Sequence, residues 1–76
     1  MTTHIIIICA KESSELALEL ALVYAMMHTP THLIGWATCD TESPNLKFFK
    51  ELGGQVHDVE LSTVLASYPT AQIIRL

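Results

Sequence analysis

The chain has 76 residues, of which 50% are hydrophobic and only 16% are charged, and its formal net charge is −4. This length allows one compact domain over 1–76, and the high apolar fraction excludes intrinsic disorder. The 4 Lys and Arg residues form no run, which argues against direct binding to nucleic-acid phosphates.

The N-terminal segment lacks the features of a targeting sequence. No basic region precedes its apolar run, and the longest apolar stretch is shorter than the ~20 residues needed to cross a bilayer. A chain with only 2 Cys residues and no secretory start suits a reducing compartment. We therefore expect a cytoplasmic protein that makes no contact with a membrane.

The first predicted elements are a strand over 4–9 and a long helix. The strand contains an uninterrupted isoleucine run, which is typical of a strand covered on both faces. The helix begins with Ser13 as its N-cap and runs to about residue 28, where Thr29 and Pro30 stop it. Its segment 16–27 has almost no polar side, although so small a domain has little interior in which to hide it.

The rest of the chain predicts two further strand–helix units and a last strand. Ser43 and Pro44 are a typical helix start, whereas Gly53 and Pro69 are typical helix ends. In chain order, the predicted elements are a strand over 33–39, a helix over 45–52, a strand over 55–61, a helix over 62–68 and a strand over 71–76.

The alternation βαβαβαβ predicts an α/β fold, a small open parallel sheet of four strands with right-handed connections. The first two strands are the most apolar and suit the centre of the sheet. The third strand contains Asp58 and Glu60 and the fourth contains Arg75, so both suit edges. We therefore expect the order 3-2-1-4, half of a doubly wound fold. The alternative order, 2-1-3-4, places the polar third strand in the middle.

The apolar helix leads to the main functional hypothesis. A single stripe along it is acidic in its first half and apolar in its second, with the members Glu12, Glu15, Glu19, Leu22, Val23 and Met26. The apolar half either lies under a loop or the C-terminal residues, or forms a docking patch with an acidic flank that orients the partner. We favour the patch. The chain would then be a non-enzymatic protein–protein interaction module (a regulator, an inhibitor or an assembly subunit) that docks on a partner protein or on itself, most simply as a homodimer.

A second hypothesis places a small-ligand or thiol-redox site at the carboxyl edge of the sheet. Cys9 and Lys11 follow the first strand, and Cys39 and Asp40 follow the second. Neighbouring strand ends are close enough for a reversible Cys9–Cys39 disulfide, although each cysteine also suits a small buried position. The first turn has no glycine to cradle a phosphate and the chain has no C-x-x-C, so we expect no cofactor.

Three histidines could meet at the opposite, amino edge of the sheet. His4 begins the first strand, His28 ends the first helix and His32 begins the second strand, whereas His57 lies inside the third. Three imidazoles can hold zinc, but ligands spread over three elements are weak evidence, and we expect no metal site. No serine has a histidine and a carboxylate ordered for nucleophilic catalysis, so we expect no enzyme.

Overall fold

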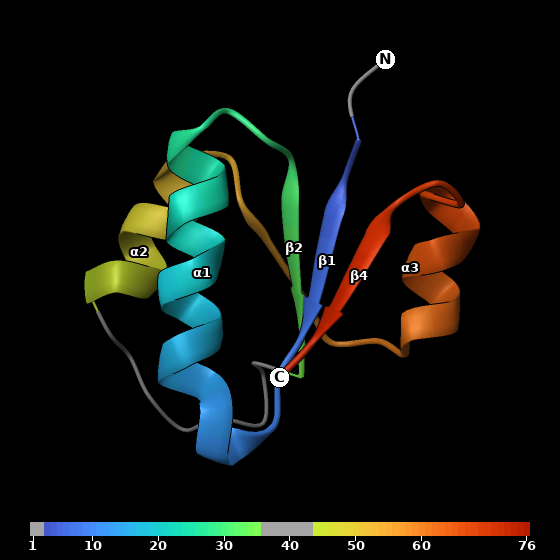
Figure 1. Ribbon diagram of the computed structural model, residues 1–76, viewed down its shortest axis with the longest axis horizontal. Helices are drawn as coiled ribbons and strands as arrows, with labels where there is room; N and C mark the ends of the chain where they lie inside the picture. Colours follow the sequence, from blue (N-terminus) through green and yellow to red (C-terminus); the bar gives the residue numbers. More distant parts are fainter. Residues whose placement is uncertain (1–2, 36–43) are drawn as a thin grey trace.

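The computed structural model describes residues 3–35 and 44–76 (Figure 1). Its elements in chain order are β1 (Ile5–Ile8), the 3-10 turn η1 (Lys11–Ser13), α1 (Ser14–Met26), β2 (Thr31–Ile34), α2 (Pro44–Glu51), β3 (Gln55–His57), α3 (Leu61–Ser67) and β4 (Gln72–Arg75). The strands form a parallel sheet in the order β3-β2-β1-β4. This arrangement confirms the predicted α/β fold and strand order.

Helices cover both faces of the sheet, but unequally. α1 and α2 lie together on one face, and α3 lies on the other face beside β4 (Figure 1). Right-handed crossovers from β1 to β2 and from β2 to β3 bring the first two helices to the same face. The crossover from β3 to β4 runs in the opposite direction across the sheet and therefore brings α3 to the other face.

Alternation along the strands divides the apolar side chains between two cores. Ile7 and Phe49 belong to the larger core between the sheet and the helices α1 and α2. Ile6 and Ile34 pack with Val64 in the smaller core beneath α3. Successive side chains of a strand point to opposite faces, so the isoleucine run of β1 supplies both cores.

α1 packs on the sheet through small side chains. Ala17, Ala21 and Ala25 recur every four residues, and each is at most 4% exposed. Because they are small, the helix can approach the sheet closely. Leu18 is buried beside them at 4% exposed, whereas other large side chains of the helix, such as Val23 and Met26, stay exposed. The apolar segment 16–27 therefore has a buried side and an exposed side.

Two predicted strand boundaries are wrong. β2 begins at Thr31, which pairs with Ile5, because Pro30 already presents its carbonyl oxygen to the Ile5 amide at 2.9 Å. β3 ends at His57, because pairing with the short β2 reaches only that far and the exposed residues 58–60 cross to α3. Ser13 occupies the N-cap of α1, but its side chain makes no capping hydrogen bond.

Candidate functional site

The outer surface of α1 presents large apolar side chains to solvent. Val23 and Met26 are 51% and 55% exposed, whereas Leu22 is half-buried and packs against the larger core. Leu16 and Met27, which the sequence reasoning did not single out, are 57% and 63% exposed. We refer to the four exposed residues Leu16, Val23, Met26 and Met27 as the α1 patch.

Carboxylates lie before and beside the α1 patch. Glu12, Glu15 and Glu19 are all exposed, and Glu15 in the first turn of α1 has a favourable interaction with the helix dipole, whereas Glu19 lies between Leu16 and Val23. His28 is exposed just beyond the opposite end of α1, where its backbone has a φ of 60°. The helix therefore has an acidic beginning, an apolar outer face and an imidazole at its end.

The second predicted site lies only partly within the described residues. Cys9 is 6% exposed at the end of β1, and its Sγ donates a hydrogen bond to the carbonyl oxygen of Ile34 at 3.5 Å. Lys11 is exposed on η1. Cys39 and Asp40 lie outside the described residues, and so does the disulfide considered between Cys9 and Cys39. What the structure places at this edge is a buried thiol and an exposed ammonium group.

A row of hydrogen-bonded histidines crosses the sheet on the α3 face. His4 Nδ1 lies 2.8 Å from His32 Nε2, and His32 Nδ1 lies 2.9 Å from His57 Nε2. His4 immediately precedes β1, His32 lies in β2 and His57 ends β3, so the three come from three adjacent strands. We refer to His4, His32 and His57 as the histidine row.

Tyr68, which follows α3, covers two rings of the histidine row. Its ring stacks on that of His4 with a centroid distance of 4.2 Å and lies 4.4 Å from the ring of His32. His32 is thereby left only 1% exposed, while His4, His57 and Tyr68 are half-buried. Burial, and then the proximity of His57 and His4, lowers the pKa of His32 from 6.5 to about 4. At neutral pH, His32 is an uncharged imidazole with one N–H.

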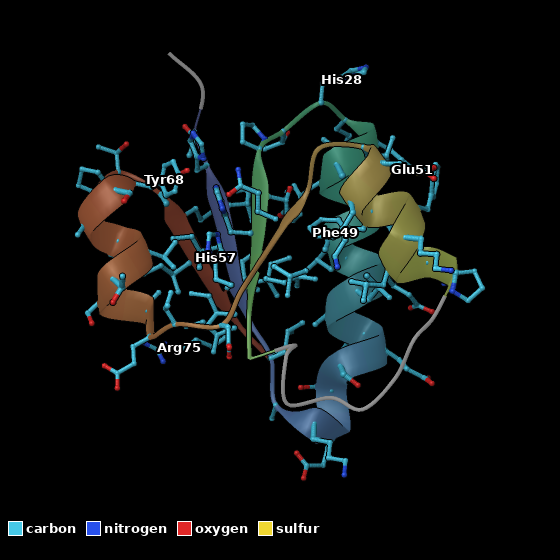
Figure 2. All side chains as sticks on the ribbon, turned by 180° about the vertical axis from the view of Figure 1, so that it is seen from behind. His28, Phe49, Glu51, His57, Tyr68 and Arg75 are labelled. Atoms are coloured by element: carbon cyan, nitrogen blue, oxygen red, sulfur yellow. The ribbon has the colours of Figure 1, made fainter. Side chains whose placement is uncertain are left out.

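Of the three histidines that could meet at the amino edge of the sheet, His4 and His32 do so and His28 does not. Figure 2 shows His28 at the turn after α1, well apart from His57 and Tyr68. His57 joins the row because its neighbour Val56 packs in the larger core, which turns His57 to the α3 face. His57 pairs in register with Ile34, a member of the smaller core. Alternation along the strands, combined with the strand order, would have identified it.

The histidine row is not arranged as a metal site. His32 directs each of its ring nitrogens at a different neighbour, so the imidazoles form a line and do not surround a common centre. Within residues 3–35 and 44–76, no group of three or more His, Cys, Asp or Glu side chains could hold a metal ion. The chemistry that this geometry allows is the sharing and transfer of protons between imidazoles.

Comparisons with known proteins give no indication of function, which must be argued from the α1 patch and the histidine row. No protein-family model matches the chain, and neither the curated proteins nor the solved structures include a match. Among the helices of the described ranges, none has the length and apolar character needed to cross a membrane.

Proposed function

We propose that this protein is a non-enzymatic interaction module that pairs with a second copy of itself through the α1 patch, as an assembly subunit or regulator. The observation that supports the proposal is the exposure of the patch, because its four apolar side chains are 51–63% exposed on a single helix. An apolar cluster of this kind on so small a domain is typical of a surface that a partner covers.

The free energy available from the patch favours a weak dimer. Full burial of a large apolar side chain contributes about 1.5–3 kcal/mol, and these side chains are roughly half exposed. Covering four of them in each of two copies therefore contributes about 6–12 kcal/mol. Association itself costs about 4–15 kcal/mol, so the net free energy is at most about 8 kcal/mol in favour of the dimer, and the expected dissociation constant is about 1 µM or weaker.

Charge favours a second copy as the occupant of the patch. The patch extends from Leu16 to Met27, so two antiparallel α1 helices centred on it set each Leu16 against Met27 of the second copy. The same register sets Glu15 of each copy against His28 of the other, which pairs a carboxylate with an imidazole. It also keeps Glu12 and Glu15 of the two copies at opposite ends of the interface, where their repulsion is screened, whereas Glu19 lies nearer its centre.

Sedimentation velocity over about 10 µM to 1 mM tests the proposal, and the chain provides a matched pair of variants. Val23 in the patch is 51% exposed, and Val59 in the crossover before α3 is 47% exposed. We expect dimerisation in the wild-type protein and in Val59→Glu, and a monomer at all concentrations for Val23→Glu, because the new carboxylates would be buried facing each other. A monomeric wild-type protein at 1 mM, or equal loss of dimer in both variants, would contradict the proposal.

A further inference from the structure

The hydrogen bonds of the histidine row limit how many protons it can hold. Its three rings have six nitrogen atoms, and four of these face each other in the two short contacts. Each contact accommodates one proton, since a hydrogen bond needs one donor and one bare acceptor nitrogen. The two remaining nitrogens, His4 Nε2 and His57 Nδ1, point outward from the row and can each hold one more. The intact row therefore holds at most four protons.

Three neutral imidazoles already hold three protons, so the intact row can accept a single further one. When it does, any one of His4, His32 and His57 can carry the positive charge. The charge moves from ring to ring only when a proton shifts along one of the two hydrogen bonds. A second added proton would place two N–H groups against each other across 2.8 or 2.9 Å. That contact has no acceptor, so one of the hydrogen bonds must break.

We infer that the histidine row is a shared site for one proton and that a second proton opens the α3 side of the domain. His32, against which Tyr68 packs, takes part in both contacts, and Tyr68 closes α3, so the separation of either contact disturbs the packing between the sheet and α3. Separation therefore uncovers the smaller core formed by Ile6, Ile34 and Val64, which are each at most 7% exposed. The row thus acts as an acid-sensitive latch between the sheet and α3.

Among the described residues, no carboxylate hydrogen-bonds to the row and could neutralise a second charge. His4 and His57 are the ionisable neighbours that disfavour protonation of His32, and Tyr68 is its neighbour from the end of α3. Asp58 follows His57 but is exposed to solvent, and Glu60 lies at the opposite end of α3 from Tyr68. On β4, Arg75 pairs with Ile8, at the far end of β1 from His4. None of these makes a hydrogen bond to the row among the described residues.

The proton count predicts a steep dependence of folding on pH. As the pH falls below 6.5, each of the three histidines takes up one added proton in the unfolded chain, whereas the folded row takes up only one in total. The unfolding equilibrium constant should therefore rise by up to about 100-fold per pH unit as the pH falls, because up to two protons are taken up on unfolding. If the other two rings titrated independently and only buried His32 stayed uncharged in the folded protein, one proton would be taken up on unfolding. The equilibrium constant would then rise by about tenfold per pH unit.

Two variants of the full chain isolate the row, with urea unfolding measured by circular dichroism between pH 5 and 6. His57→Gln leaves a two-histidine row that still accepts one proton when folded, so the rise should drop to about tenfold per pH unit. His28→Gln removes the exposed histidine that lies outside the row and should retain the rise of about 100-fold. A tenfold rise in the wild-type protein, or equal slopes in the wild type and His57→Gln, would overturn the inference.

Ring-nitrogen NMR of the folded wild-type protein provides a second readout that needs no variant. We expect the protonation of His4, His32 and His57, summed over the three rings, to reach one added proton and stop there while the amide spectrum remains folded. Loss of the Tyr68 ring contacts should accompany the second proton. A folded spectrum with two fully charged rings in the row would overturn the inference.

Discussion

Replacing His32 by leucine should remove much of the acid sensitivity of this domain. In the wild-type protein, burial lowers the pKa of His32 from 6.5 to about 4, so between these values the unfolded chain binds a proton that the folded chain does not. The free energy of unfolding therefore falls as the pH decreases from about 6.5 to about 4, and is fully regained above 6.5. The His32→Leu variant has no such group and should lack this loss.

The magnitude follows from the size of the pKa difference. One pKa unit corresponds to 1.36 kcal/mol, so lowering the pKa of His32 from 6.5 to about 4 corresponds to roughly 3 kcal/mol. We therefore expect His32 alone to contribute about 2–3 kcal/mol of stability at pH 7 that is absent at pH 4. A domain of this size has about 3–5 kcal/mol in total, so the wild-type protein should be at or past its unfolding midpoint at pH 4.

Urea titrations of both proteins at pH 7 and pH 4, followed by circular dichroism, measure this contribution. His32→Leu is expected to be the less acid-sensitive protein, with a smaller loss by at least about 2–3 kcal/mol, because leucine does not titrate and also removes both hydrogen bonds that limit protonation of the histidine row. The reasoning is refuted if the two proteins lose the same stability between pH 7 and pH 4, or if His32→Leu loses more.

Three further predictions concern the packing. Phe49→Ala should cost about 3–5 kcal/mol and abolish the cooperative thermal transition, because Phe49 is 0% exposed in the larger core; a transition that survives near the wild-type temperature would contradict this. Gly53→Ala should cost about 1–2 kcal/mol for its φ of 94°, whereas Gly54→Ala should cost more, because its new methyl group would overlap the Phe49 ring; urea midpoints in the reverse order would contradict the packing described. Tyr68→Leu should raise the pKa of His32 toward 6.5 in an NMR titration by admitting water, and Tyr68→Phe should not; equal shifts would exclude ring coverage as the cause.

The fold was predictable because burial in this chain follows directly from side-chain type. The isoleucine run and the apolar Leu33 and Ile34 indicate central strands, and polar Asp58 and Arg75 indicate edge strands, which suffices for the strand order. The ends of β2 and β3 were less predictable, because backbone pairing with the neighbouring strand decides them. Side chains in the sequence do not report where that pairing begins or stops.

The surface of α1 was only partly predictable, because its orientation depends on which stripe packs on the sheet. The three glutamates suggest which side of the helix faces solvent. The alanines such as Ala21 set the buried side, however, and the exposed side therefore differs from the one that the glutamates suggest. Leu22 is therefore half-buried, and Leu16 and Met27 are exposed. The histidine row was missed for a similar reason, since finding His57 requires the face of β3 and the strand order together.

A cysteine cross-linking experiment tests the central claim most directly, since it reports the register of two copies along α1. Leu16→Cys and Met27→Cys proteins, each also carrying Cys39→Ser, would be mixed under mild oxidation. An antiparallel pairing centred on the α1 patch brings these two positions together, so a mixed disulfide-linked dimer should form much faster than either homodimer. No cross-linking above that of a Val59→Cys control, or preferential formation of a Leu16→Cys homodimer, would contradict the account.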